Sequence, residues 1–95
     1  MNPIEIFNTE CKNRIESQGK NEPLLQASKT FMEASIRSGY SYNFKWMGRP
    51  IIQYPQDMIA VQEIIWNIQP DLIIETGIAH GGSLIYYASL LELTG

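Results

Sequence analysis

The chain has 95 residues, of which 44% are hydrophobic and 18% are charged, and its formal net charge is −3. A chain of this length forms one small domain or part of a larger one, and it can bury only a thin core. The acidic balance argues against a general nucleic-acid binder, because such proteins depend on clustered basic residues.

The charges are unevenly distributed along the chain. All seven basic residues lie in the first 49 positions, together with five acidic residues, whereas residues 50–95 carry five acidic residues and no base. An anionic ligand in the second part would therefore depend on backbone N–H groups rather than on side-chain charge.

Three absences narrow the class of protein further. Cys11 is the only cysteine, so an internal disulfide and a Cys-x-x-Cys motif are impossible. The N-terminus lacks the basic start and apolar run of a signal peptide. We expect no membrane span, because the most apolar window, Leu72 to Leu93, is interrupted by Glu75, His80 and three glycines. These features predict a cytoplasmic protein.

Apolar periodicity predicts two helices in the first part of the chain, over residues 3–17 and 24–37, with a polar break between them. The inner face of the first helix is expected to contain Ile4, Phe7, Cys11 and Ile15. Residues 40–54 have no helical period, and four aromatic residues alternate there with polar ones. Such an extended segment would form either a lid over a ligand or an edge packed on the body, with its aromatic side presenting Tyr40, Tyr42, Phe44 and Trp46.

A third helix is predicted between Pro55 and Pro70, because proline suits a first helical turn and stops a helix interior. Asp57 would lie near the positive end of its dipole. Its inner stripe is expected to be Met58, Val61, Ile65 and Ile68.

A last helix is predicted over residues 83–93, with Ser83 as its N-cap. Its expected inner face is Leu84, Tyr87, Ala88 and Leu91.

Between these helices, Leu72–Ile74 is a short apolar run of the kind found in a strand buried on both faces of a parallel sheet. Helix, strand, glycine loop and helix form the first half of a βαβ unit, so the expected fold is α/β. A parallel strand needs a neighbour, and each crossover takes a dozen residues or more. We therefore expect a longer parent protein, with a helical extension over residues 1–54 and the start of a cofactor-binding domain over residues 55–95.

The segment "DLIIETGIAHGGS" carries the chemistry. Gly77 would let the chain turn off the strand, while Gly81 and Gly82 would let a ligand approach the backbone. The N–H groups of the following helix would point at the same place. A simple tight turn is the alternative interpretation of such a loop. His80 within it either touches a ligand or is a solvated side chain.

Two cofactor patterns fit this loop. Gly77-x-Ala79-x-x-Gly82 satisfies a relaxed dinucleotide fingerprint, and Glu75-x-Gly77-x-Ala79-x-Gly81 fits the S-adenosylmethionine pattern. The carboxylate favours S-adenosylmethionine, because Coulomb attraction suits a sulfonium and an ammonium group better than a pyrophosphate. A nicotinamide-dependent oxidoreductase stays open as an alternative, as does a non-catalytic remnant or interaction module.

Residues 46–92 closely resemble the cephalosporin hydroxylase family, which is grouped with rhamnosyl O-methyltransferases. The resemblance covers about half of the chain, whereas residues 1–38 resemble the family only loosely. The motifs that carry it are Trp46-x-Gly48, Gln53-x-Pro55-x-Asp57, Gln62-Glu63, Pro70 to Gly77, and Ala79-x-Gly81-Gly82-Ser83.

The resemblance implies a Rossmann-like, S-adenosylmethionine-dependent methyltransferase that is often an oligomer. It implies a magnesium ion whose ligands lie on later strands, so no metal ligand and no catalytic residue are assigned here. The expected activity of the whole protein is methyl transfer to an oxygen of a small molecule or glycolipid sugar, and the 95 residues alone are expected to be inactive. The cofactor residues implied by matching motif are Glu75, Gly77, Ala79, Gly81, Gly82 and Ser83.

Overall fold

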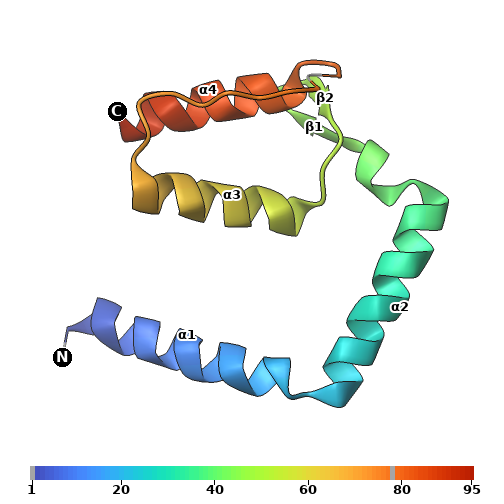
Figure 1. The fold of residues 1–95 in the computed structure, drawn as a ribbon, viewed down its shortest axis with the longest axis vertical. Coiled ribbons are helices and arrows are strands. Elements are labelled where there is room, and N and C mark those ends of the chain that lie inside the picture. Colours follow the sequence, from blue (N-terminus) through green and yellow to red (C-terminus); the bar gives the residue numbers. More distant parts are fainter. Residues whose placement is uncertain (1, 78) are drawn as a thin grey trace. The chain divides into compact units, whose positions relative to one another are not determined.

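The computed structural model describes residues 2–77 and 79–95, which form two compact units, Met1–Arg37 and Ser38–Gly95. The first contains most of two helices, and the second contains a hairpin and two further helices (Figure 1). No helix among these residues is both long and apolar enough to cross a membrane. The elements are α1 (Pro3–Gly19), α2 (Glu22–Ser38), the 3-10 turn η1 (Tyr40–Tyr42), β1 (Phe44–Trp46), β2 (Arg49–Ile51), α3 (Pro55–Ile68) and α4 (Gly82–Thr94).

Side-chain caps explain where α1 and α2 begin. The Asn2 side chain accepts from the Glu5 N–H at 2.9 Å, and the Glu5 carboxylate accepts from the Asn2 N–H at 3.3 Å. This reciprocal capping box satisfies two N–H groups that the helix itself leaves unpaired. The Asn21 side chain similarly accepts from Leu24. Both predicted helices are confirmed, but the expected inner face of α1 is exposed at Ile4, Phe7 and Ile15.

Strands β1 and β2 form an antiparallel hairpin in which Phe44 lies opposite Ile51 and Trp46 opposite Arg49. The two turn residues, Met47 and Gly48, have φ values of 50° and 82°. Positive φ at both positions is the geometry of a type I′ turn, whose twist matches that of paired strands. The extended aromatic segment predicted for residues 40–54 is therefore wrong in detail, because its start is a 3-10 turn and its middle folds back on itself.

Helix α4 holds the second unit together by packing on both strands and on α3. Its buried residues, Gly82, Tyr86 and Leu90, are spaced four apart and so share one face. The inner face predicted for this helix is wrong at Leu84, which is 49% exposed, and at the exposed Ala88, whereas Tyr87 packs against the core. The buried hydrophobic core of the unit comprises Ile51, Ile65, Tyr86 and Leu90, with Phe44, Trp46, Met58, Val61, Ile73 and Tyr87 packed against it.

Helix α3 runs from Pro55 to Ile68, as its two flanking prolines predict, but its inner stripe is shorter than expected. Ile65 is buried and Met58 and Val61 pack against the core, whereas Ile68 is 66% exposed. The buried stripe of α3 therefore ends at Ile65.

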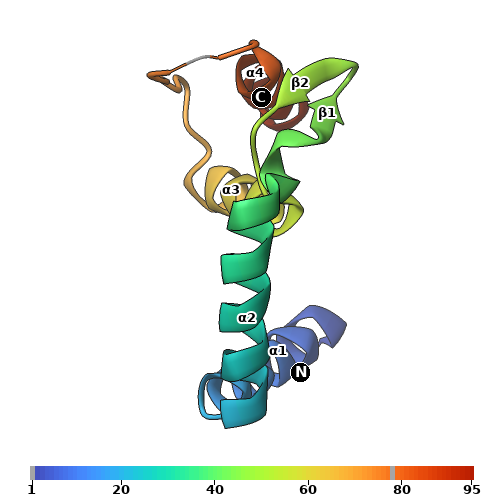
Figure 2. The same cartoon turned by 90° about the vertical axis from the view of Figure 1, so that its right-hand side faces the viewer.

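The predicted strand at Leu72–Ile74 is not formed. Leu72 is 73% exposed and Ile74 82% exposed, and the segment belongs to no ladder. A strand needs a neighbour for its backbone hydrogen bonds, and the hairpin does not supply one. Figure 2 shows the reason, because the segment that follows α3 passes on one side of α4 while β1 and β2 lie on the other.

Tyr86 joins the three parts of the second unit. Its hydroxyl donates to the Met58 carbonyl of α3, and its ring lies edge-on to Trp46 of β1 with centroids 4.8 Å apart. The Trp46 indole N–H in turn donates to the Ser89 hydroxyl of α4 at 3.2 Å. Burial, and secondarily the neighbouring Tyr87, raise the pKa of Tyr86 above its ordinary value.

We expect Tyr86→Phe to lower the free energy of unfolding by about 1 kcal/mol, because the Met58 carbonyl loses its donor. Since the folded-state pKa is raised above 10.0, the contribution of the neutral hydroxyl is complete below that pH and is lost as the pH rises through the folded-state pKa. Urea unfolding in a pH series measures both effects. Wild type should lose stability above pH 10 more steeply than the variant.

The matched control is Tyr42→Phe, because Tyr42 is 69% exposed. Its unfolding curve should follow that of wild type at every pH. An equal loss in the two variants would contradict the role given to the buried hydroxyl.

Candidate functional site

The loop before α4 has an unusual backbone, with φ values of 75° at Gly77, 54° at Ala79 and 83° at Gly81. A left-handed conformation costs roughly 1 kcal/mol at a residue with a Cβ, so Ala79 is held against its own preference. We call the described residues Gly77, Ala79, His80 and Gly81 the glycine loop. Its conformation turns the chain sharply from the preceding segment into α4.

Ser83 has a role that the sequence did not predict. Helix α4 begins at Gly82, and its N-cap, Gly81, offers no side-chain hydrogen bond. The Ser83 hydroxyl instead donates to Oε1 of Glu75, which lies on the opposite side of the loop. The predicted N-cap is therefore wrong, and Ser83 orients the carboxylate that precedes the glycines.

The second carboxylate oxygen of Glu75, Oε2, is buried and has no hydrogen-bond partner among the described residues. A buried carboxylate oxygen without a donor costs free energy, because it has lost the water that would solvate it. The arrangement fits a ligand that brings a hydrogen-bond donor or a positive charge to Oε2. This is the chemistry expected of the amino and sulfonium groups of S-adenosylmethionine.

Glu75 faces a pocket of about 310 Å³ between the glycine loop, β2 and α4. This volume lies at the lower end of the range for small-molecule sites. Four of the six predicted cofactor residues line it. The full lining is Pro50, Ile51, Ile52, Gln53, Glu75, Gly77, Ala79, Ser83 and Tyr87.

The other two predicted residues, Gly81 and Gly82, are not part of this lining, and both pack against β2. A Cβ on Gly81 would lie 3.3 Å from the Arg49 guanidinium, and one on Gly82 would lie 2.1 Å from the Pro50 carbonyl oxygen. From the sequence, we expected glycine at position 82 so that a ligand could approach the backbone. The structure gives another reason, because the backbone of β2 occupies that space.

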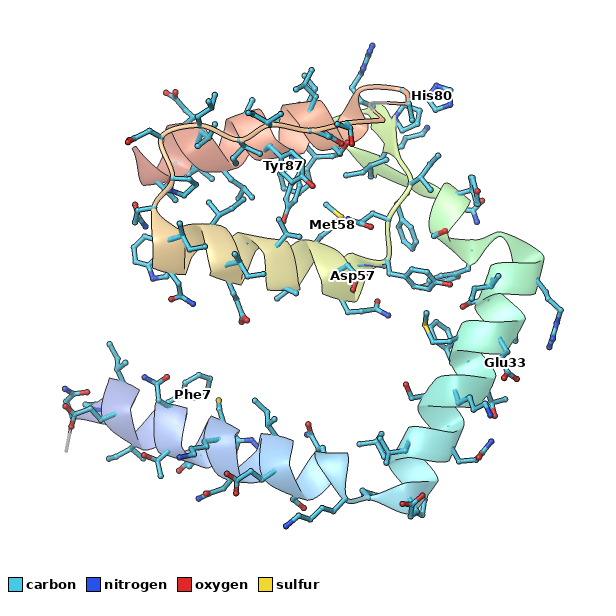
Figure 3. All side chains as sticks on the ribbon, viewed as in Figure 1. Phe7, Glu33, Asp57, Met58, His80 and Tyr87 are labelled. Carbon is cyan, nitrogen blue, oxygen red and sulfur yellow. The ribbon has the colours of Figure 1, made fainter. Side chains whose placement is uncertain are left out.

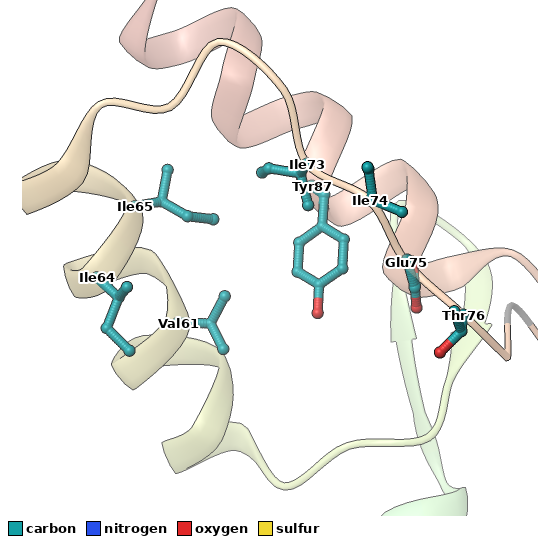
Figure 4. A pocket seen from close by; sticks show the side chains of 8 residues that line it. All are labelled: Val61, Ile64, Ile65, Ile73, Ile74, Glu75, Thr76 and Tyr87. Atoms are coloured by element: carbon teal, nitrogen blue, oxygen red, sulfur yellow. The ribbon is translucent and has the colours of Figure 1, made fainter.

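A second cavity, of about 370 Å³, lies beside the first and shares Glu75 and Tyr87 with it. Its other lining residues are mostly aliphatic and come from α3 and from the segment after α3. In Figure 4 the Tyr87 ring extends from α4 into this cavity, between Val61 of α3 and the segment that carries Glu75 and Thr76. The lining is Val61, Ile64, Ile65, Ile73, Ile74, Glu75, Thr76 and Tyr87.

Two parts of the pocket lining were not predicted from the sequence. One is Tyr87, and the other is the wall formed by β2 and the two residues after it. Tyr87 follows Ser83 by one helical turn, so the spacing of four was a usable signal for a shared face. Ile52 and Gln53 lie more than 20 positions before the loop, and no local pattern connects them to it. Their place in the site depends on the packing of β2 against α4.

The remaining candidates lie outside both pockets. His80 is exposed at the outer end of the glycine loop, as its interpretation as a solvated side chain predicted (Figure 3). Asp57 is exposed in the first turn of α3, where it can interact with the helix dipole. The aromatic residues of the proposed lid line neither pocket, and Phe44 and Trp46 pack against the core. No group of three or more metal-ligating residues occurs within residues 2–77 and 79–95.

Residues 38–95 match the family described as Rhamnosyl O-methyltransferase/CmcI. Proteins named rhamnosyl O-methyltransferase from Mycobacterium tuberculosis and Mycobacterium bovis are 38% identical to the chain over 50 residues, and one from Mycobacterium leprae is 37% identical. The match covers 53% of this chain and about a fifth of the length of each relative. No solved structure matches the chain significantly.

The contact between Gly82 and β2 can be tested by adding one methyl group. Gly82→Ala would place a Cβ 2.1 Å from the Pro50 carbonyl oxygen, a separation that real structures do not show. We expect the free energy of unfolding to fall by about 1–3 kcal/mol, since either the helix or the strand must shift. Thermal unfolding measures this loss.

Gly19→Ala is the matched control, because nothing lies within 4 Å of a Cβ at that position in α1. It should leave the melting temperature unchanged or raise it slightly, as alanine favours a helix. A Gly82→Ala protein as stable as wild type would contradict the close contact.

Proposed function

Because this chain belongs to the Rhamnosyl O-methyltransferase/CmcI family, we propose that it forms part of an S-adenosylmethionine-dependent O-methyltransferase. The observation that carries the cofactor assignment is the buried, unpartnered Oε2 of Glu75 beside the glycine loop. The acceptor in this proposal is a hydroxyl group of a small molecule or of a glycolipid sugar. Support for a sugar comes from the names of the mycobacterial relatives.

The charge of the site favours a cationic ligand group. Glu75 brings a carboxylate to the pocket, Ser83 fixes its orientation, and no lysine or arginine is among the residues that line the pocket. In a partly dry site, attraction between opposite charges is stronger than in water. A pyrophosphate at the same place would be repelled, which disfavours the nicotinamide cofactor considered from the sequence.

Methyl transfer makes limited chemical demands on these residues. When bound, S-adenosylmethionine supplies an already electrophilic methyl group, so the protein acts mainly by orienting the reactants. Glu75 and Ser83 would fix one end of the cofactor. The glycine loop would let it approach the backbone, and Ile51 and Ile52 would shield it from water.

A magnesium site is not formed by the described residues. The described residues contain no group of three acidic, histidine or cysteine side chains that could hold it. In the proposed whole enzyme, the magnesium ligands implied by the family resemblance would come from other strands.

The Rossmann-like fold and the division at residues 54 and 55 also belong to this proposal. In the whole enzyme, the segment around Leu72–Ile74 would become a strand whose neighbours come from further sequence. Two observations support this. Leu72 and Ile74 expose large apolar side chains, and the curated relatives are about five times as long as the matched stretch. A homo-oligomer and a cytoplasmic location remain predictions for the whole protein.

We expect Glu75→Gln in the protein made from its complete gene to weaken binding of S-adenosylmethionine by about ten- to one-hundredfold. This range corresponds to the loss of a charge-assisted hydrogen bond. Isothermal titration calorimetry measures the dissociation constant. NADH titrated into wild type provides the comparison ligand and should not bind.

Glu92→Gln removes the same charge from an exposed position on α4 and should bind the cofactor like wild type. Equal losses in both variants would point to a general charge effect and contradict the local role of Glu75. Binding of NADH in preference to S-adenosylmethionine would overturn the proposed function.

A further inference from the structure

Arg49 connects the hairpin to the glycine loop. It is the first residue of β2, and its Nη2 donates to the backbone carbonyl of His80 at 3.1 Å. The two residues are 31 positions apart, so this bond is a tertiary contact rather than a local turn. Arg49 makes no ion pair with any residue in the described part of the chain.

The same strand also holds the two residues after His80. The Arg49 guanidinium lies close above Gly81, where a Cβ would be 3.3 Å from Nη2. The next residue of the strand, Pro50, occupies the space beside Gly82. Three consecutive residues at the end of the loop are thus held by two consecutive residues of β2.

We propose that Arg49 is a positioning residue for the cofactor pocket, which fixes the glycine loop against β2 through the His80 carbonyl. It acts through the loop, because it is exposed and is absent from the pocket lining. The proposal rests on the proposed function in one respect only, the identity of the ligand.

The physical reason lies in the conformation that the loop must keep. Its two glycines, Gly77 and Gly81, give the backbone many alternatives in the absence of a restraint, and Ala79 must keep a left-handed conformation against its own preference. A loop that is ordered before binding loses less conformational entropy when the ligand arrives. The planar guanidinium suits this role, because its donors are held in one rigid plane and less side-chain freedom is lost when Nη2 binds the carbonyl.

The contact made by Arg49 differs from that of a typical exposed arginine. Surface arginines commonly interact only with water and contribute little to stability. Arg49 instead directs a donor at a backbone oxygen on the element that carries the ligand site. Its effect should therefore appear in loop order and ligand affinity, and little in global stability.

The first experiment measures loop order without any ligand. Wild type, Arg49→Ala, Arg49→Lys and Lys45→Ala, each made as the product of the complete gene, are digested with a non-specific protease under native conditions. Cleavage sites are located by mass spectrometry. Exposed mobile loops are preferred sites of nicking. We expect Arg49→Ala to speed cleavage between residues 76 and 83 about tenfold, the change that one net hydrogen bond produces.

Lys45 is the matched control, because it is an exposed basic residue on the neighbouring strand. Lys45→Ala should be cleaved like wild type. Arg49→Lys keeps the charge but loses the fork geometry, so its cleavage rate should lie between those of wild type and Arg49→Ala.

The second experiment measures affinity for S-adenosylhomocysteine, the demethylated form of the cofactor, by calorimetry on the same four proteins. Arg49→Ala should raise the dissociation constant about tenfold, while its melting temperature stays within a few degrees of wild type. Faster loop cleavage with unchanged affinity would overturn the positioning role. Unchanged cleavage in Arg49→Ala would overturn the proposal outright.

Results that contradict the proposed function differ from those that contradict the role of Arg49. If wild type binds neither S-adenosylmethionine nor S-adenosylhomocysteine, the ligand assignment is wrong. The contact between Arg49 and the loop is then judged by the cleavage rates alone.

Discussion

The close approach of β2 to the start of α4 is the contact on which the second unit depends. It is possible only because Gly82 has no side chain, since the Pro50 carbonyl fills the space that a Cβ would take. Once these backbones meet, Trp46 reaches Tyr86 and Ser89, and Arg49 reaches the His80 carbonyl. One missing methyl group therefore determines both the core of the unit and one wall of its pocket.

The polar centre of the site is built on that apolar framework. Glu75 and Ser83 come from opposite ends of the glycine loop, and their hydrogen bond closes the loop at its base. Tyr87 follows on the same helix and separates the pocket beside β2 from the more aliphatic cavity beside α3. The site thus combines one buried, unpartnered carboxylate oxygen with a lining of both polar and apolar residues, and the positive group of the proposed ligand would pair with that oxygen.

Local signals in the sequence predicted what local physics determines. Pro55 and Pro70 indicated the ends of α3, and the glycine spacing indicated the loop and the residue before it. The hairpin escaped prediction because its turn, Met47-Gly48, puts a non-glycine residue at a positive φ and differs from the common Asn-Gly signal. The inner face of α4 was wrong because an almost uniformly apolar helix has no periodicity of its own. Contacts with β2 and α3 select the face that carries Tyr86 and Leu90.

The segment after α3 keeps the side-chain alternation of a strand, although it pairs with no neighbouring strand. Ile73 packs against the core and Glu75 lines the pocket beside β2, whereas Leu72 and Ile74 are 73% and 82% exposed. This alternation has the two-residue period of a strand, although no ladder is present. A shift of one residue would turn Glu75 away from Ser83 and expose Ile73 in its place. The position of the carboxylate therefore depends on the burial of Ile73. A packing contact thus determines where the negative charge of the proposed cofactor site lies.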